Sequence, residues 1–135
     1  MEKILITAMK LMKVEKNSEV SLLLTDDKEI RNLNKSYRNI DSPTDVLSFS
    51  MNENKSNQLL PGDIDEYLLG DIVISIETAE KQAKKLDHSL DFELTALLIH
   101  GLLHLIGFDH IREKDFQRMK EEENRITALL EKTLD

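Results

Sequence analysis

The sequence contains no cysteine and no long hydrophobic run. Without cysteine, disulfide bonds and thiolate metal sites are excluded, so a transition metal would have to be held by histidine and carboxylate side chains. The N-terminal segment MEKILITAMKLMK is too short and too interrupted by lysines for a signal peptide, and no stretch approaches the length of a membrane span. We therefore expect a soluble, cytoplasmic protein.

Basic residues are scarce relative to acidic ones. The chain has 18 Lys and Arg against 26 Asp and Glu, a formal net charge of -8. This balance argues against tight, nonspecific binding of nucleic acid over the whole surface and leaves room only for a local basic patch. A length of 135 residues suits one domain with its own hydrophobic core. No repeat or change in composition divides the chain, so we predict a single domain over residues 1–135.

Apolar spacing and capping signals predict the order helix, strand, helix, strand, strand, helix, helix, helix. The predicted segments are a helix through residues 4–12, the strand 19–25, a helix from Asp26 to near Arg38, the strands 46–50 (VLSFS) and 71–76 (DIVISI), and helices around 79–86, 91–106 and 116–130. The marker residues of the sixth and last elements are Ala79, Ala83 and Leu86, and Phe116, Met119, Ile126 and Leu130. This order implies a right-handed crossover between the first two strands and a small mixed sheet packed with helices, in the α/β or α+β class.

The stretch HGLLHLIGFDH, residues 100–110, holds three of the four histidines of the chain. It ends a helix whose residues are apolar on almost every side, which indicates a buried helix. His100 and His104 are four residues apart, so their side chains lie roughly 40° apart on one helix face. Gly107 is a natural helix stop, and the turn that it permits could return His110 to the same face.

These histidines indicate a metal site. A lone histidine in such a helix is ordinarily a core residue with a hydrogen bond, but a buried helix has no reason to desolvate two stacked imidazoles unless their nitrogens find a partner. A metal ion satisfies them directly. Three neutral imidazoles leave a fourth tetrahedral position open, which is the catalytic type of zinc site and can bring bound water to a pKa near about 7.

The spacing of the three histidines also resembles the metzincin metalloprotease signature, and the helix is zincin-like in this sense. Those proteases carry a glutamate that acts as general base immediately after the first histidine, where this chain has Gly101. Asp109 could replace that base, although an aspartate beside a ligand more often orients it. Proteolysis is therefore disfavoured.

Three segments together resemble the YbeY family of bacterial endoribonucleases. HGLLHLIGFDH is similar to the metal motif of that family, and LNKSYRNIDSPTDVLSFSM and LLGDIVIS are similar to its other signature segments, in the same order and spacing. The resemblance implies one Zn²⁺ per chain, bound by His100, His104 and His110, with Arg38 as a catalytic residue. It also implies cleavage of single-stranded RNA in ribosomal RNA maturation, at the 3′ end of the small-subunit RNA, and in ribosome quality control, with RNA and the ribosome as partners and no role for DNA.

The chain departs from this family pattern at three points. Phe108 stands where tyrosine is usual and Ser50 where proline is usual. The sequence also begins at the first helix, without the strand that usually precedes it. Three predicted strands then remain, with an edge that this missing strand would otherwise cover.

Arg38 has a chemical rationale of its own, since a guanidinium can hold a phosphodiester bidentately and stabilise charge that develops on phosphorus. From the residues alone, an ordinary surface arginine is the favoured interpretation, and the resemblance reverses that preference. Arg31 and Lys35 share its helix face and would extend a basic strip, or would simply be solvated. We expect the matched residues Thr44, Asp45 and Ser48 to serve a turn and a strand, and His88 to have no function.

The acidic run that begins at Glu121 is expected to be a solvated helix face, with a second metal site there as a weak guess. Two other functions fit the same residues. One is a metallopeptidase or amidohydrolase that uses the three histidines, and the other is a noncatalytic ribosome-associated factor. The attacking group, which is water or the ribose 2′-hydroxyl, also stays open.

Overall fold

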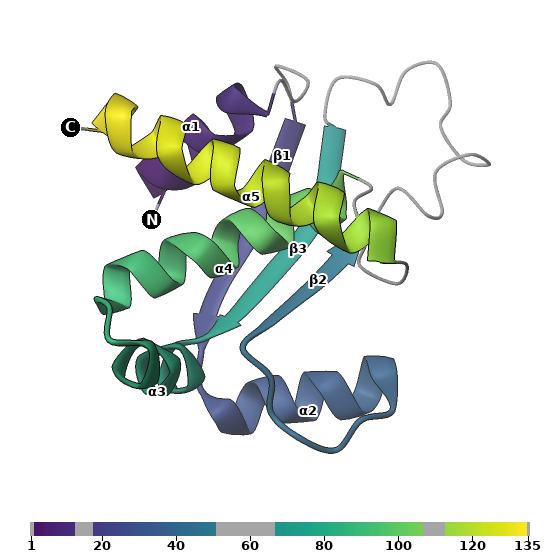
Figure 1. Ribbon diagram of the computed structural model, residues 1–135. Coiled ribbons are helices and arrows are strands. Elements are labelled where there is room, and N and C mark those ends of the chain that lie inside the picture. The colour runs from purple at the N-terminus through teal and green to yellow at the C-terminus, as the bar shows by residue number, and fades with distance from the viewer. Residues whose placement is uncertain (1, 13–17, 51–66, 107–112, 135) are drawn as a thin grey trace, which may run out of the picture.

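The computed structural model describes residues 2–12, 18–50, 67–106 and 113–134. Within these ranges the chain forms helices and strands in the predicted order (Figure 1). They are α1 (Glu2–Leu11), β1 (Ser18–Thr25), α2 (Asp27–Arg38), β2 (Val46–Ser50), β3 (Tyr67–Ser75), α3 (Ile76–Leu86), α4 (Leu90–Leu105) and α5 (Glu113–Leu134). A small mixed sheet packed with helices confirms the predicted fold class. No helix in these ranges is long and apolar enough to cross a membrane.

The strands of the described chain lie in the order β1-β3-β2. β3 is the central strand, and it pairs with β1 in parallel and with β2 in antiparallel. The predicted crossover between the first two strands is therefore wrong, because the parallel neighbour of β1 is β3. Both α2 and β2 lie on the connection that joins β1 to β3. The order of elements did not reveal this pairing, because a strand can pair with a later strand of the chain as well as with the next one.

β3 is longer at its start than the predicted strand 71–76. It begins at Tyr67, the last residue of the predicted polar loop, and residues 67 and 68 pair with residues 18 and 19 of β1. Gly70 has a φ of 151°, and a Cβ there would lie 2.1 Å from the backbone oxygen of Phe49. Only glycine permits this close approach between β3 and β2. The rest of the predicted polar loop, residues 51–66, lies outside the described residues.

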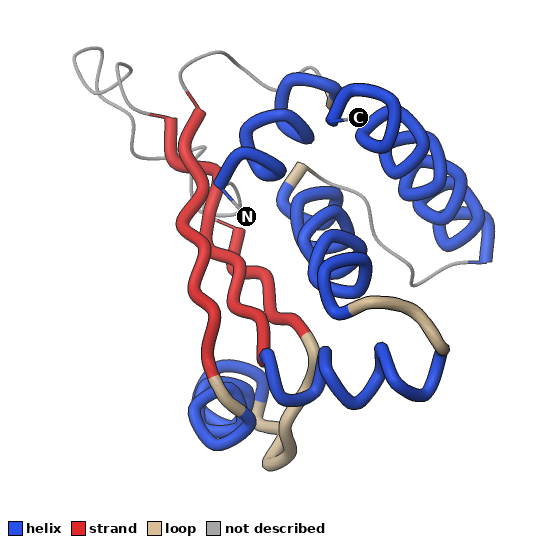
Figure 2. The backbone as a smooth tube through the Cα atoms, turned by 90° about the vertical axis from the view of Figure 1, so that its left-hand side faces the viewer, coloured by secondary structure: helices blue, strands red, loops and turns tan. Residues whose placement is uncertain are grey.

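Helices cover both faces of the sheet. Figure 2 shows α1, α4 and α5 on one side, where their apolar residues form one cluster with Ile72 and Ile74 of β3. On the other face Ile30 of α2 packs with Leu47 and Val73, which are cross-strand partners and therefore point to the same side. The long predicted core helix is confirmed. The buried residues of α4 are Glu93, Leu94, Leu97, Leu98, Ile99, Gly101, Leu102, Leu103 and Leu105.

The predicted helix starts are confirmed by their caps. The Asp26 carboxylate accepts a hydrogen bond of 2.8 Å from the Glu29 N–H at the start of α2. Ser89 accepts one of 3.0 Å from the Phe92 N–H at the start of α4. Each cap satisfies a backbone donor that has no partner within its helix. At the other end of α2, Asn39 adopts the left-handed conformation that ends the helix immediately after Arg38.

Some residues expected on buried helix faces are exposed instead, among them Leu86 and Phe116. Leu86 is 61% exposed and Phe116 is 52% exposed. Each lies in an end turn of its helix, the last turn of α3 and the first of α5. Periodicity marks the face on which a residue lies, but neighbouring elements decide how far along the helix that face is covered. The other expected residues of α5, namely Met119, Ile126 and Leu130, are buried.

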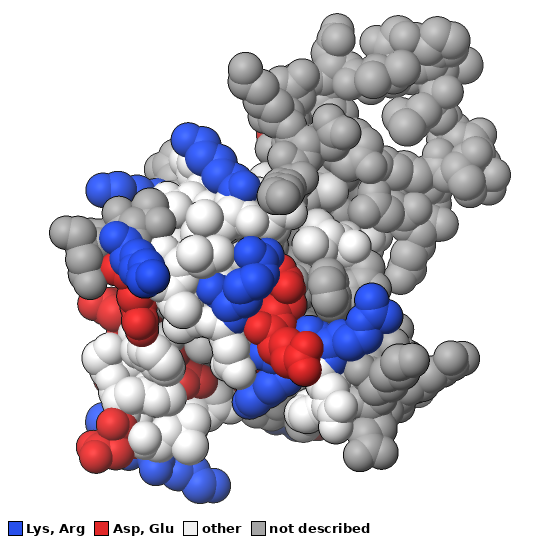
Figure 3. Space-filling view, turned by 45° about the horizontal axis from the view of Figure 1, so that its top comes forward, with Lys and Arg blue, Asp and Glu red and all other residues white. Residues whose placement is uncertain are grey.

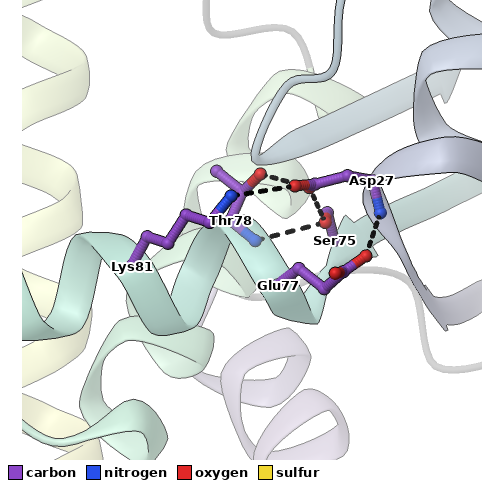
Figure 4. A network of polar contacts seen from close by, with 5 residues as sticks. All are labelled: Asp27, Ser75, Glu77, Thr78 and Lys81. Atoms are coloured by element: carbon purple, nitrogen blue, oxygen red, sulfur yellow. Dashed lines mark hydrogen bonds and ion pairs between the residues drawn. The ribbon is translucent and has the colours of Figure 1, made fainter.

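A polar junction joins the start of α2 to the start of α3 (Figure 4). The Asp27 carboxylate accepts hydrogen bonds of 2.5 Å from the hydroxyls of Ser75 and Thr78, and the Lys81 ammonium lies 3.5 Å from it. In return, Glu77 accepts a hydrogen bond of 2.8 Å from the Asp27 N–H. The Ser75 hydroxyl, followed by the Thr78 hydroxyl and the Lys81 ammonium, lowers the pKa of Asp27. The junction holds the start of α2 against the start of α3.

Candidate active site

A cavity of about 460 Å³ lies between the end of α2, the strand β2 and the second half of α4. Arg38, His100 and His104 all line it. Thr44, Ser48 and Ser50 complete much of its wall. The fold therefore brings together residues that are more than sixty positions apart in the sequence. Three of the four site residues predicted from the sequence meet in one cavity.

The two histidines of α4 turn the same ring nitrogen toward each other. The Nε2 atoms of His100 and His104 are 3.2 Å apart, and the two rings meet at 77°. Two nitrogens bound to one tetrahedral zinc ion at about 2.0–2.1 Å lie about 3.3 Å apart. The observed separation thus fits two ligands of a single ion, as the four-residue spacing predicts.

The third predicted ligand, His110, and the predicted helix stop, Gly107, lie outside the described residues. Within the described ranges, no three His, Cys, Asp or Glu side chains are grouped to hold a metal ion. α4 itself ends at Leu105, and Ile106 is its C-cap. The helix therefore ends where the sequence predicts, immediately before the glycine.

Glu123 of α5 contacts the outer nitrogen of His100. Its Oε1 lies 2.6 Å from Nδ1 of the imidazole, and the two side chains are 24% and 34% exposed. This role of Glu123 was not predicted from the sequence, because the acidic run indicated a solvated helix face. A signal was available: Glu123 follows Met119 by four residues and precedes Ile126 by three, so it lies on the apolar face of its own helix.

Gly101 faces the sheet rather than the cavity. A Cβ on Gly101 would lie 3.0 Å from Cγ2 of Ile72 and 3.1 Å from Oγ of Ser48. The Ser48 hydroxyl also donates a hydrogen bond of 3.2 Å to the Gly101 carbonyl oxygen. The glycine therefore lets α4 pack directly on β2 and β3, and a glutamate at this position would enter the helix–sheet contact.

Other residues singled out in the sequence have structural contacts. Asp45 Oδ1 accepts a hydrogen bond of 2.7 Å from the Val46 N–H at the start of β2, which agrees with a role in the turn. His88 Nε2 lies 2.5 Å from a carboxylate oxygen of the buried Glu93. These contacts give Asp45 and His88 structural roles, and Asp45 also lines the cavity.

The predicted basic strip on α2 is partly neutralised. The Arg31 guanidinium donates a hydrogen bond of 2.8 Å to Asp41, and this contact lowers the pKa of the Asp41 carboxyl. Lys35 adds a smaller contribution to the same effect. Elsewhere on the surface, on the face that Figure 3 shows, acidic and basic side chains are interspersed. Of the three basic residues Arg31, Lys35 and Arg38 on this face of α2, Arg38 is the one that lines the cavity of the histidines.

The cavity combines two chemical capacities. Imidazole nitrogens that converge from α4 can hold a metal cation, and the fixed positive charge of Arg38 can hold an oxyanion beside it. Residues with hydroxyl groups, Thr44, Ser48 and Ser50, also line the cavity. A phosphate ester is the substrate group that uses both capacities, because its oxygens can bind the metal ion and the guanidinium together.

Comparison with known proteins gives a consistent result. The family described as Endoribonuclease YbeY matches residues 1–131. The chain is 46% identical over 128 residues to the endoribonuclease YbeY of Caldicellulosiruptor bescii, covering 93% of this chain and 81% of the relative. It is 45% identical over 119 residues to that of Aquifex aeolicus, covering 87% and 74%. A solution structure from Thermotoga maritima is similar with a TM-score of 0.58 and 26% identity, covering 98% of this chain and 84% of that one.

Proposed function

This chain belongs to the YbeY family of endoribonucleases, and we propose that it cleaves single-stranded RNA at a zinc centre. The observation that carries the proposal is the shared cavity of Arg38, His100 and His104. We place this activity in the maturation of ribosomal RNA, at the 3′ end of the small-subunit RNA, and in ribosome quality control. The ribosome is then a partner, and the cytoplasm is the location.

His100, His104 and His110 would hold the metal ion. Two of these residues present nitrogens at a separation that suits zinc, and the absence of cysteine from the chain leaves imidazole and carboxylate as its possible ligands. When bound, zinc supplies a Lewis acid, which stabilises negative charge at a phosphoryl oxygen and favours deprotonation of water. Three neutral ligands keep its double charge uncompensated, which suits an anionic substrate.

Arg38 would bind and orient the scissile phosphodiester. The guanidinium is planar and permanently charged, so it can donate two parallel hydrogen bonds to phosphate oxygens and gain strength as charge develops there. A cavity of about 460 Å³ has room for a phosphate with its flanking ribose. Binding concentrated at this site is consistent with the net charge of -8, which does not favour RNA over the whole surface.

The test pairs cleavage with metal content. In single-turnover cleavage of an unstructured RNA, Arg38→Ala should reduce the rate about 100- to 1,000-fold, because one charge-stabilising donor is lost. Bound zinc, measured by elemental analysis, should stay near one per chain. Arg125→Ala is the matched control, since this guanidinium pairs with Glu122 on α5 and should leave both quantities unchanged.

Three outcomes discriminate between the possible functions. If zinc-loaded protein of verified purity cleaves no RNA, the enzyme proposal fails and a noncatalytic ribosome-associated factor takes its place. If the protein cleaves peptides and His104→Ala abolishes that cleavage, the metallopeptidase alternative is correct. If RNA is cleaved, a cyclic phosphate on the product shows attack by the ribose 2′-hydroxyl, and its absence throughout the reaction favours attack by water.

A further inference from the structure

We propose that Glu123 is a positioning residue of the metal site, whose carboxylate fixes the ring of His100 so that its Nε2 atom faces the ion. This inference rests on the zinc site of the proposed function. The contact joins two helices, α4 and α5, and it spans 23 residues of sequence. It therefore makes the last helix part of the active site without placing a catalytic residue on it.

The position of Glu123 on α5 is the first argument. Met119, Ile126 and Leu130 are at most 2% exposed and pack into the main hydrophobic cluster. Glu123 lies on the same face, one turn from Met119 and one turn from Ile126. A carboxylate in such a place is costly unless a hydrogen bond or a charge compensates it. His100 Nδ1, at 2.6 Å, supplies that compensation.

The contact with an ionised Glu123 also fixes which nitrogen of His100 carries the proton. An ionised carboxylate can only accept hydrogen bonds, so the proton of this contact belongs to Nδ1 of His100. In the neutral ring the lone pair is then on Nε2, the nitrogen that faces His104 at 3.2 Å. Carboxylates that accept from the outer nitrogen of a metal-bound histidine fix its tautomer, orient its ring and raise its basicity.

The neighbouring glutamates show that the contact is specific to one residue. Glu122 forms an ion pair with Arg125 one turn along the same helix. Glu121 is exposed to solvent. Of these three consecutive carboxylates in the described chain, Glu123 is the one that contacts His100. The acidic run is thus divided between solvent, a surface pair and the metal site, and Glu121 becomes a natural control.

The experiment measures zinc affinity by competition with a chelator, without RNA. Glu123→Ala should raise the zinc dissociation constant about 10- to 100-fold, the usual effect of removing such a carboxylate. Glu123→Gln keeps a neutral acceptor and should give a smaller increase. Glu121→Ala should stay within about twofold of the wild type, because its carboxylate does not contact the site.

Nitrogen NMR of the histidine rings in the metal-free protein provides a second measurement. Wild type should show His100 with its proton on Nδ1, and Glu123→Ala should lose this preference. The inference is overturned if folded Glu123→Ala, checked by circular dichroism, binds zinc as tightly as the wild type. If Glu123→Ala does not fold, the isosteric Glu123→Gln decides in its place: a wild-type dissociation constant in that variant overturns the inference.

The two proposals can fail separately. A protein that binds zinc, responds to Glu123→Ala and cleaves no RNA would remove the endoribonuclease activity and leave the role of Glu123 intact. Conversely, RNA cleavage that depends on Arg38, together with zinc affinity that is indifferent to Glu123, would keep the activity and remove this inference.

Discussion

Two polar clusters of the molecule use similar contacts for different ends. At the Asp27 junction, a carboxylate meets two hydroxyls and an ammonium, so complementary donors and acceptors satisfy one another and hold two helix starts together. In the site, His100 and His104 present chemically identical nitrogens to each other. Two like nitrogens are better satisfied by a common third partner, such as a metal ion, than by each other. Complementarity within a cluster therefore indicates a structural role, and convergence of like atoms beside a cavity indicates a binding role.

The largest expected effect comes from breaking the histidine pair. His104→Ala should reduce RNA cleavage about 1,000-fold or more, because metal-ion stabilisation of several kcal/mol is lost and each 1.4 kcal/mol corresponds to about tenfold in rate. The single-turnover rate of RNA cleavage and the zinc content should fall together. The unfolding transition of the metal-free variant should stay close to that of the metal-free wild type. A variant that keeps zinc at the wild-type level would contradict the binding role, and one that loses zinc and still cleaves at the wild-type rate would contradict the role of the metal in cleavage.

A smaller effect, on stability alone, is expected at the junction. Asp27→Ala should lower the free energy of unfolding by about 2–3 kcal/mol, because hydroxyl donors lose a charged acceptor in a half-buried site. Urea unfolding monitored by circular dichroism measures this change, and zinc affinity should not move. Lys81→Ala is the control, since its long contact of 3.5 Å joins an exposed ammonium and should add no measurable stability. Equal losses in both variants would assign the junction to the ion pair instead.

The smallest expected effect is the pH dependence of the stability that the Asp27 junction contributes. The pKa of Asp27 is lower in the folded chain than its ordinary value of 3.8. Its ionised form therefore stabilises the fold above the unfolded pKa, and this contribution is lost as the pH falls through the lower, folded pKa. The stability difference between wild type and Asp27→Asn should be constant above about pH 5 and shrink below about pH 4. Urea unfolding across this range tests it, and a difference that persists unchanged at pH 3 would contradict it.

Much of the fold followed from local sequence signals. The caps at Asp26 and Ser89, the end of α2 near Arg38 and the apolar character of α4 all depend on neighbouring residues, and the structure confirms them. The partner of β1 and the early start of β3 depend on pairing between distant segments, which no local pattern encodes. That the whole chain, residues 1–135, is one domain stays a prediction.

The candidate site divides in the same way. Helical spacing was sufficient to place His100 beside His104, and the resemblance of the YRN segment pointed to Arg38, which the structure places in the same cavity. The zinc-binding role of all three histidines and the catalytic role of Arg38 stay predictions. Glu123 was missed because its partner lies on another helix. Its position on the apolar face of α5 was the local signal. The packing of α5 on α4 was needed to show that this position lies beside His100.

Gly101 also bears on how this scaffold could be redesigned. Adding a glutamate after the first histidine would seem the shortest way to convert the enzyme into a peptidase. That side chain would begin 3.0 Å from Ile72 and 3.1 Å from the Ser48 hydroxyl, inside the seam between helix and sheet. The Ile72 and Ser48 side chains would have to yield by a few tenths of an ångström before it fits. The two chemistries are thus separated on this scaffold by the packing between α4 and the sheet as well as by the identity of one residue.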